Sequence, residues 1–368
     1  MKKIISIFII LCLVSAWPLI NREMSAKASP EARTWNVDDD GPADFTNIQE
    51  AINNASSGDT IFVHVGTYYE HVVINKTITL VGEDSNFTII DGNETDNVIH
   101  IRANIATVKN FTIRKSGMYP YSGIFVDDSI GTVITDNRVI YNYEGISLLY
   151  SSSSVVSGNN ISSNYHGIYL YSSSDNVFSG NAIFSNNYDG VYLYSSSNNV
   201  FSDNAMYNGF VGISLHYSSS NVFSGNAIFS NNYDGVYLYS SSDNVFSGNA
   251  IFSNNYHGIN LALRSSNNTI YHNNFNNKIQ ARSESTNFWD YDKEGNYWSD
   301  YAKQDLNKDG IGDAPYAIGV VNKDNYPLMG TFSEFSITLE RETYSVTVIS
   351  NSTISLLCFR LEQKRGTK

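Results

Sequence analysis

The sequence predicts an all-β protein, a right-handed single-stranded parallel β-helix with coils of about 22 residues. Gly, Ser, Asn and Tyr dominate the composition, and only 16% of the residues are charged, which disfavours helix-rich and disordered chains. The segment VFSGNAIFSNNY occurs three times without a change, at Val177–Tyr188, Val222–Tyr233 and Val245–Tyr256. The segment GVYLY at 190–194 alternates apolar and tyrosine residues, which is the period of a β-strand.

Aligning the chain with itself shows one position of the repeat recurring at intervals of 22 to 24 residues. Its members are Val133, Val155, Val177, Val200, Val222, Val245 and Thr269. Such a period is typical of stacked coils, in which no single repeat buries its own apolar face. We expect three short strands per coil, around Val177, Ile183 and Val191, with Val and Ile filling the core. A leucine-rich repeat is excluded, because it needs a helix and a Leu framework.

Asparagines recur at the corners between the expected strands. One column contains Asn137, Asn159, Asn181, Asn204, Asn226, Asn249 and Asn273, and the other contains Asn142, Asn164, Asn186, Asn231 and Asn254, with an interruption at Gly209. Asn tolerates left-handed backbone angles, and its amide can donate to and accept from copies in neighbouring coils. We therefore interpret both columns as structural ladders.

The ends of the chain differ from the repeats. Residues 1–28 resemble an export signal, with two lysines before an apolar stretch and Ala26-Lys27-Ala28 as the cleavage site, and an uncleaved membrane anchor is the alternative. We expect an N-terminal cap and the first coils over 35–97, β-helix repeats over 98–285 and a C-terminal cap over 286–330. Residues 331–368 predict a β-hairpin around Asn351-Ser352, which either packs on the β-helix or begins a truncated second β domain.

These repeats, together with the segment VDDDGPADFTNIQEAINNASSGDTIFVHVGTYYEHVVINKTITLVGE at 37–83, resemble the NosD-like secreted proteins of archaea, within the pectin-lyase-like superfamily. The resemblance covers roughly residues 35–330. It implies a short helix around Ile48–Asn54 that caps the first coil, and the apolar positions there have the period of a helix. It implies no single activity, because the superfamily includes lyases, hydrolases, epimerases and adhesins.

The segment DLNKDGIGD resembles the first part of an EF-hand calcium loop. Its candidate ligands are Asp305, Asn307, Asp309, the carbonyl of Ile311, and Asp313. Tyr316 stands where the bidentate Glu of such a loop would be, and no flanking helices are evident. We predict a calcium loop that stiffens the C-terminal cap, and an Asp/Gly-rich turn is the alternative. The aromatic residues expected to cover the last coil are Trp289, Tyr297, Trp298, Tyr301, Tyr316 and Tyr326.

Tyrosines form two columns on the outward face of the GVYLY strands. The first column contains Tyr169, Tyr192 and Tyr237, and the second contains Tyr171, Tyr194 and Tyr239. Exposed aromatic rings can stack on sugar rings while their hydroxyls form hydrogen bonds, which suits a polysaccharide lying along the helix axis. The alternative is that tyrosine serves as a strand former that stacks on itself.

A polar column precedes the turn glycines, and its members are Glu144, His166, Asp189, Val211, Asp234 and His257. Acids and imidazoles in adjacent coils could form an acid/base pair, although Asp-Gly and His-Gly are also ordinary turn pairs. Pectate-lyase relatives imply an Arg base, but the coils from Val133 to Tyr256 contain only Arg138 as a basic residue. The Asp-Pro-His stretch of alginate-epimerase relatives is absent from the sequence. If a unique site exists, we expect it where the repeat is irregular, in the coil Val200–Tyr217 or in the C-terminal cap.

The net charge of −13 disfavours nucleic acid and anionic membranes as partners, since both require clustered Lys and Arg. We expect an exported, secreted or cell-surface monomer without a membrane span after signal cleavage, which binds polysaccharide or envelope glycan. A polysaccharide lyase, epimerase or glycoside hydrolase is one alternative, and a structural or adhesive envelope protein is another. The NosD resemblance implies copper chaperoning, but the few Cys and Met and the 7 scattered His do not form the soft cluster that copper(I) prefers.

Overall fold

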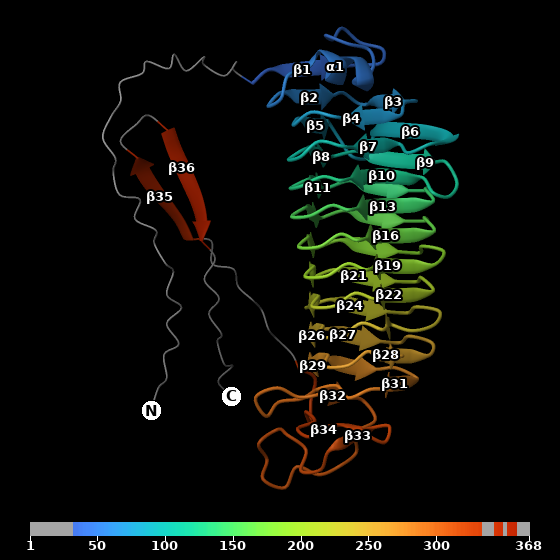
Figure 1. Cartoon of the computed structure of the whole chain (residues 1–368), viewed down its shortest axis with the longest axis vertical. Helices are drawn as coiled ribbons and strands as arrows, with labels where there is room; N and C mark the ends of the chain where they lie inside the picture. Colours follow the sequence, from blue (N-terminus) through green and yellow to red (C-terminus); the bar gives the residue numbers. More distant parts are fainter. Residues whose placement is uncertain (1–31, 333–341, 349–351, 359–368) are drawn as a thin grey trace. The chain divides into compact units, whose positions relative to one another are not determined.

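The computed structural model describes residues 32–332, 342–348 and 352–358. The predicted export signal lies outside the described residues. The described residues confirm the predicted fold class, because their strands stack as a parallel β-helix of three sheets (Figure 1). Among the described residues, no helix has the length and apolar character needed to span a bilayer.

Each complete coil contributes one strand to each of three sheets, which we name A, B and C. Sheet A contains β1 (Thr34–Val37), β2 (Thr60–Val63), β5 (Thr79–Gly82), β8 (Thr107–Lys109), β11 (Val133–Thr135), β14 (Val155–Ser157), β17 (Val177–Ser179), β20 (Val200–Ser202), β23 (Val222–Ser224), β26 (Val245–Ser247) and β29 (Thr269–Tyr271). Sheet B contains β3 (Gly66–Tyr68), β6 (Thr88–Thr95), β9 (Thr112–Ser116), β12 (Arg138–Ile140), β15 (Asn160–Ser162), β18 (Ala182–Phe184), β21 (Ala205–Tyr207), β24 (Ala227–Phe229), β27 (Ala250–Phe252), β30 (Asn274–Asn276) and β32 (Tyr297–Trp298). Sheet C contains β4 (Val72–Ile74), β7 (Ile99–Ile101), β10 (Ser122–Asp127), β13 (Glu144–Leu149), β16 (His166–Tyr171), β19 (Asp189–Tyr194), β22 (Val211–His216), β25 (Val236–Tyr239), β28 (His257–Ala262) and β31 (Ile279–Ser283).

The helix α1 (Ile48–Asn54) lies at the N-terminal end of the stack, as predicted. The Asn47 side chain caps it by accepting a hydrogen bond from the Glu50 amide, and the Glu70 carboxylate accepts from the Ile48 and Gln49 amides at 2.7 and 2.9 Å. The helix therefore begins where its free N–H groups find oxygen acceptors. Its buried residues are Ile48, Ala51 and Ile52.

The core consists of stacked apolar columns, and it corrects one prediction. In sheet C, Val191 and Leu193 are fully buried while the tyrosines beside them face outward, as the alternation predicted. In sheet A the prediction that Val fills the core is wrong, because Val177 is 38% exposed and the adjacent Phe178 is fully buried. A three-residue strand places its middle side chain inward and its flanking side chains outward. The resulting ladder of Phe178, Phe201, Phe223 and Phe246 has ring centroids 4.5 to 5.0 Å apart.

Both predicted Asn columns form buried hydrogen-bonded ladders. Asn204 donates from Nδ2 to the Phe178 carbonyl and, from both Nδ2 and its backbone amide, to Oδ1 of Asn226, at 2.9 to 3.0 Å. In the second ladder, Gly209 lacks the side chain, but its amide still donates to Oδ1 of Asn231 at 3.1 Å. A third ladder, which the sequence analysis did not identify, runs through Asn176, Asn199, Asn221, Asn244 and Asn268.

Aromatic residues close the C-terminal end of the stack. The Trp298 ring stacks on Phe275 of the last coils at 4.6 Å and on Tyr316 at 4.3 Å. Its Nε1 donates to the buried Asp324 carboxylate at 2.9 Å. Two strands of this cap, β33 (Tyr316–Ile318) and β34 (Asn322–Asp324), pair antiparallel.

A separate antiparallel pair follows the cap, formed by β35 (Glu342–Val348) and β36 (Ser352–Cys358). The two strands lie in the stretch where we predicted a β-hairpin, and the second strand begins at Ser352, where we expected the turn.

Candidate functional site

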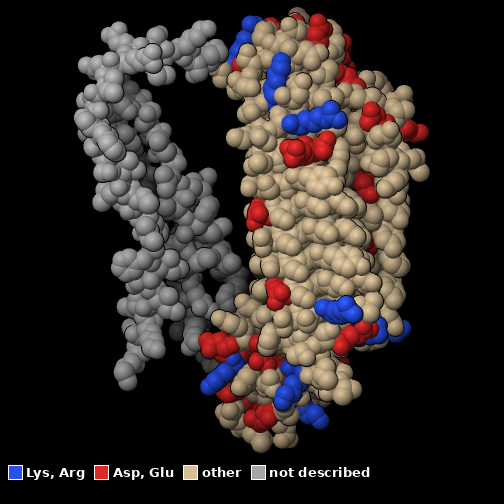
Figure 2. All heavy atoms as spheres, viewed as in Figure 1, with Lys and Arg blue, Asp and Glu red and all other residues tan. Residues whose placement is uncertain are grey.

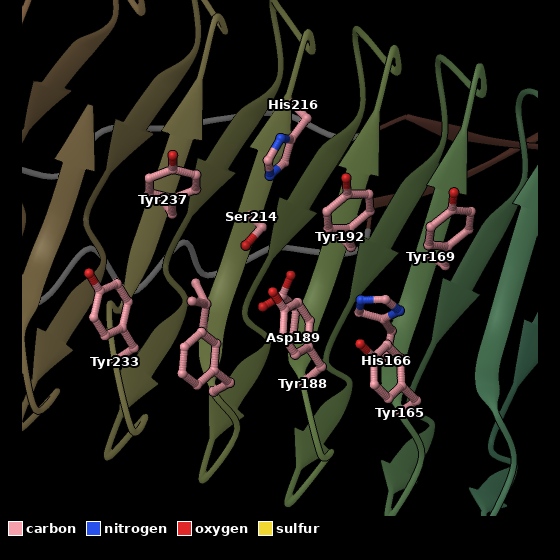
Figure 3. A pocket seen from close by; sticks show the side chains of 12 residues that line it. Tyr165, His166, Tyr169, Tyr188, Asp189, Tyr192, Ser214, His216, Tyr233 and Tyr237 are labelled. Atoms are coloured by element: carbon pink, nitrogen blue, oxygen red, sulfur yellow. The ribbon is translucent and has the colours of Figure 1, made fainter. Parts of the chain in front are cut away.

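A cleft of about 500 Å³ opens on sheet C around the irregular coil that contains β22 (Figure 3). It is lined by Tyr165, His166, Tyr169, Tyr188, Asp189, Tyr192, Phe210, Val211, Ser214, His216, Tyr233 and Tyr237. The cleft lies where the repeat is irregular, in one of the two places where we expected a unique site.

The first wall of the cleft comes from the predicted tyrosine column. The rings of Tyr169 and Tyr192 stack with centroids 5.5 Å apart and planes 4° apart. Ser214 pairs with Tyr192 on one side and with Tyr237 on the other, so the column lacks a phenol ring at this coil. The His216 ring, two residues further along β22, lies 5.0 Å from Tyr192 and 5.8 Å from Tyr237. This wall is therefore interrupted at one coil.

The opposite wall is an aromatic column that we did not single out from the sequence. It consists of Tyr165, Tyr188, Phe210 and Tyr233, stacked at successive centroid distances of 5.3 Å. Each member directly precedes the position that holds His166, Asp189, Val211 or Asp234 in the four coils. The sequence contains the signal for this column, because an aromatic residue recurs at the end of the repeated segment in coil after coil. Figure 3 shows the two aromatic rows on opposite sides of the cleft, with Asp189 and His166 between them.

A glycine column lies between the floor residues and the residues of the first wall, on the same strands of sheet C. A Cβ atom on Gly190 would lie 2.7 Å from the Gly212 carbonyl oxygen, and one on Gly212 would lie 2.6 Å from that of Gly235. Neighbouring coils thus approach at this corner more closely than any side chain allows. The residue before each glycine is held at the floor, between the two walls.

His166 is fixed at the floor by Glu144 of the preceding coil. Its Nδ1 lies 2.9 Å from Oε2 and 3.1 Å from Oε1 of Glu144, and both residues are buried. Because a carboxylate only accepts hydrogen bonds, Nδ1 carries the proton and Nε2 of the neutral imidazole is an acceptor. This Nε2 is buried and has no hydrogen-bond partner within the described structure.

Asp189 lies next to His166, one coil further along the stack, and is 2% exposed. Burial raises its pKa to about 7, against the opposing effects of His166, the Ser214 hydroxyl and the backbone of Val211. Its Oδ1 is also buried without a hydrogen-bond partner in the described structure. Two polar atoms without partners thus lie at the floor of one cleft, which is unusual for buried groups and typical of functional sites.

The structure brings only some of the predicted site residues into the cleft. Tyr169, Tyr192, Tyr237, His166 and Asp189 line it. The second tyrosine column, Tyr171, Tyr194 and Tyr239, does not belong to the lining, and its rings stack among themselves and with His216.

Asp234 and His257 form a separate buried pair outside the cleft lining. Oδ1 of Asp234 accepts from the His257 backbone amide at 3.0 Å and lies 2.9 Å from Nδ1 of its ring. The Asn260 side chain donates to Oδ2 of Asp234 at 3.1 Å. These bonds satisfy the Asp234 carboxylate within the stack, as a structural pair would.

The predicted calcium loop lies in the C-terminal cap, and its carboxylates bind its own backbone. Asp305 accepts from the amides of Asp309 and Gly310 at 3.2 and 2.9 Å, and Asp313 accepts from the amide of Leu306 at 2.7 Å. Gly310 has a φ of 87°, as a tight turn at this position requires. The three carboxylates do not come within 4.8 Å of one another as a group, so calcium binding stays a prediction.

Within residues 32–332, a compact group of three potential ligands is found at Asp38, Asp39 and Asp40. These carboxylates are hard oxygen donors on the surface of the N-terminal cap. Five histidines have a ring nitrogen within 3.3 Å of a carboxylate oxygen: His64, His100, His166, His257 and His272. Met206 is fully buried in the core. The compact ligand group at Asp38, Asp39 and Asp40 therefore offers oxygen donors, unlike the thiolate, thioether and imidazole donors that copper(I) prefers.

Several solved structures share the fold of this chain at low sequence identity. ORF18 of Geobacillus virus E2 superposes with a TM-score of 0.56 at 17% identity, over 75% of this chain and 64% of that one. DFA-IIIase from Arthrobacter chlorophenolicus A6, without its lid, gives 0.55 at 14% identity, over 65% and 80% of the two chains. Pectate lyase Pel9A gives 0.50 at 14% identity, over 70% and 80%. These matches show the parallel β-helix fold.

Sequence comparison adds two findings. A cell surface glycoprotein of Methanothermus fervidus is 34% identical over 98 residues, which are 26% of this chain and 16% of that protein. The chain thus matches only a small part of that relative. The family described as periplasmic copper-binding protein (NosD) matches residues 52–228 and 183–303. Because these two stretches span well over half of the chain, the protein belongs to the NosD family.

Proposed function

We propose that this protein is an exported, cell-surface β-helix that binds a polysaccharide chain in the cleft of sheet C. The observation that carries the proposal is the pair of facing aromatic walls over a polar floor. The cell-surface assignment draws support from the matched segment of the Methanothermus fervidus glycoprotein. The proposed ligand class draws support from the chemistry of the cleft itself.

Aromatic walls suit a sugar polymer for a physical reason. The apolar face of a sugar ring packs on an aromatic ring, while the phenol hydroxyls and floor groups form hydrogen bonds with the sugar hydroxyls. Burial raises the pKa of Tyr169 to about 12 and that of Tyr237 above its ordinary value, so both present neutral hydroxyls. The walls follow the stacking direction of the coils, which favours an extended chain over a small molecule.

The two tyrosine columns allow a matched test. We expect the triple variant Tyr169→Ser, Tyr192→Ser and Tyr237→Ser to lose polysaccharide binding in affinity electrophoresis and calorimetry. The control variant Tyr171→Ser, Tyr194→Ser and Tyr239→Ser changes the same three strands outside the cleft and should bind as the unchanged protein does. Equal binding by both variants would show that the cleft is not the binding site.

A second candidate function is a glycan-acting enzyme, which the buried polar set at the floor favours. Glu144 orients His166, whose Nε2 is an acceptor, and Asp189 titrates near neutral pH. Such a pair could serve as general base and general acid on a bound sugar chain. Incubation with neutral glycans and polyuronates should then give products by mass spectrometry, and Asp189→Asn should abolish them while Asp234→Asn does not. The absence of products from all the substrates would contradict this candidate.

Copper has no place in this proposal, although the family description names it. The histidines of the described region are engaged by carboxylates, backbone or aromatic rings, and the compact acidic group at Asp38 offers oxygen donors. Copper(I) prefers thiolate, thioether and imidazole donors together. We therefore do not include copper binding in the proposed function of the cleft.

A further inference from the structure

The interruption of the first wall at Ser214 creates a recess that is unique along the cleft. Ser214 stands where the preceding coil has Tyr192 and the following coil has Tyr237. Val211, in the same coil, stands where the preceding coil has Asp189, so the recess floor is small and apolar on that side. Figure 3 shows Ser214 and His216 between the two tyrosines, with Asp189 on the neighbouring strand.

The recess borders the polar floor of the cleft. Ser214 lies on the strand next to Asp189 and favours the charged form of its carboxylate, whose Oδ1 has no hydrogen-bond partner in the described structure; Nε2 of His166 lies one coil further along the floor. A hydroxyl group is the matching ligand for such a site, because it donates to an imidazole nitrogen and also donates to or accepts from a carboxyl group.

The charges of the cleft restrict the ligand further. Its lining includes no Lys or Arg, and its carboxyl group is that of Asp189, with Glu144 buried behind His166. On the face seen in Figure 2, Lys and Arg gather near the two ends of the coil stack and leave the middle coils without them. A uronate carboxylate placed here would meet another acid and no cation, which disfavours its desolvation.

We propose that the recess at Ser214 is the selective subsite of the cleft and takes one uncharged sugar ring of a neutral polysaccharide. This inference rests on the proposed binding function and names its ligand class. The ring lies over Val211 and Ser214 beside His216, and its hydroxyls reach the floor groups. Polyuronates such as pectate and alginate are disfavoured, because the lining offers no Lys or Arg to pair with their carboxylates.

The test fills the recess with the residue that the repeat itself uses. Ser214→Tyr restores the uninterrupted ladder, in which Tyr169 and Tyr192 stack at the equivalent positions of the two preceding coils. The control is Ser202→Tyr, which makes the same substitution in the same coil but on sheet A. Sheet A accepts a tyrosine at this position of the repeat, because the corresponding residue of β29 is Tyr271. Thermal melting checks that both variants fold. If Ser214→Tyr is unstable, Ser214→Asn replaces it, since Asn260 occupies the equivalent position.

Binding is measured by calorimetry with soluble mannan, β-glucan and galactan as neutral polymers, and with alginate and polygalacturonate as acidic ones. We expect the protein to bind at least one neutral polymer and neither acidic polymer. Ser214→Tyr should weaken the affinity for the neutral polymer by about tenfold or more, and Ser202→Tyr should weaken it by less than about twofold. Polyuronate binding of similar affinity, or unchanged binding by Ser214→Tyr, would overturn the inference. In either case, the proposed polysaccharide binding would still stand if the triple variant of Tyr169, Tyr192 and Tyr237 lost binding; only the assignment of the subsite at Ser214 would be wrong. Failure of every polymer to bind would overturn both.

Discussion

Asp189 shows how one residue in a repeated position acquires distinct chemistry. The equivalent Asp234 is satisfied by His257 and Asn260, whereas Asp189 faces Val211 and Ser214 and keeps one oxygen without a partner. Its pKa rises to about 7 because it is buried, so the folded state favours the protonated form. The difference arises from neighbours in adjacent coils, since both acids occupy the same turn position before glycine.

This burial predicts a pH-dependent stability. Because the folded-state pKa is raised above the unfolded value near 3.9, the stabilising contribution of protonated Asp189 is complete below about pH 4 and is lost as the pH rises through 7. Asp189→Asn cannot ionise, so it should stabilise the fold at pH 8 by up to about 4 kcal/mol and change it little at pH 4. Burial also raises the pKa of Asp324, to about 6, so this residue contributes a similar loss of stability with rising pH in the unchanged protein and in the variant.

Thermal melting of the two proteins at pH 4 and pH 8 measures this effect. The exposed Asp243→Asn serves as the control, and its effect should be the same at both pH values. A melting temperature of Asp189→Asn that differs from the unchanged protein equally at both pH values would show that the carboxyl group is not destabilised by burial.

The Asn ladders act at the scale of the element, because each amide joins three successive coils. Asn226 accepts two hydrogen bonds from Asn204 and donates to the Phe201 carbonyl and to Oδ1 of Asn249. All of these groups are buried, so water does not replace the hydrogen bonds that are lost when the amide is removed. Each Asn side chain therefore holds the corner of its own coil against the corners of the two neighbouring coils.

Asn226→Ala should lower the free energy of unfolding by about 3 kcal/mol, since it leaves buried donors and a carbonyl without partners. The exposed Asn232→Ala in the same coil should change it by less than about 0.5 kcal/mol. Urea unfolding followed by circular dichroism measures both values. Equal effects of the two substitutions would contradict the ladder interpretation.

The loop Asp305–Asp313 carries the remaining prediction at this scale. If calcium binds there, it should raise the melting temperature of the protein, and a chelator should reverse the increase. Asp305→Asn and Asp309→Asn together should remove the response, because they replace two charged oxygen ligands. An unchanged melting temperature with and without chelator, and no heat of binding, would support the Asp/Gly-rich turn instead.

At the scale of the whole molecule, the β-helix is a one-dimensional stack in which each coil pairs with its two neighbours. The pairing keeps one register along sheet C, from β13 through β16, β19 and β22 to β25. Stability should then depend on local contacts, and the number of coils should be variable. The cleft depends only on the coils around β22.

Inserting a second copy of residues 222–244 tests this view. The insertion follows the coil that carries the recess and keeps Tyr233 and Tyr237 in place. We expect a folded protein with a similar melting temperature and unchanged polysaccharide binding. A duplicate of residues 200–221, inserted after Asn221, should fold as well but place a second recess beside the first. Aggregation or loss of cooperative melting in both variants would contradict independent coils.

The sequence by itself determined the coil length, the three strands per coil, the N-terminal helix and two of the Asn ladders. Each of these follows from a local pattern that recurs at a fixed interval, and stacking in register places equal residues above one another. It also located the irregular coil and five of the residues that line the cleft. Only the tertiary structure decided that Phe178, and not Val177, faces the core, because the inward position of a three-residue strand depends on how the corners bend. Only it placed the column of Tyr188 across the cleft from that of Tyr192, since this depends on how the chain enters the strand and not on a repeated local pattern. The chemistry of Asp189 likewise depends on which side chains the adjacent coils bring to it.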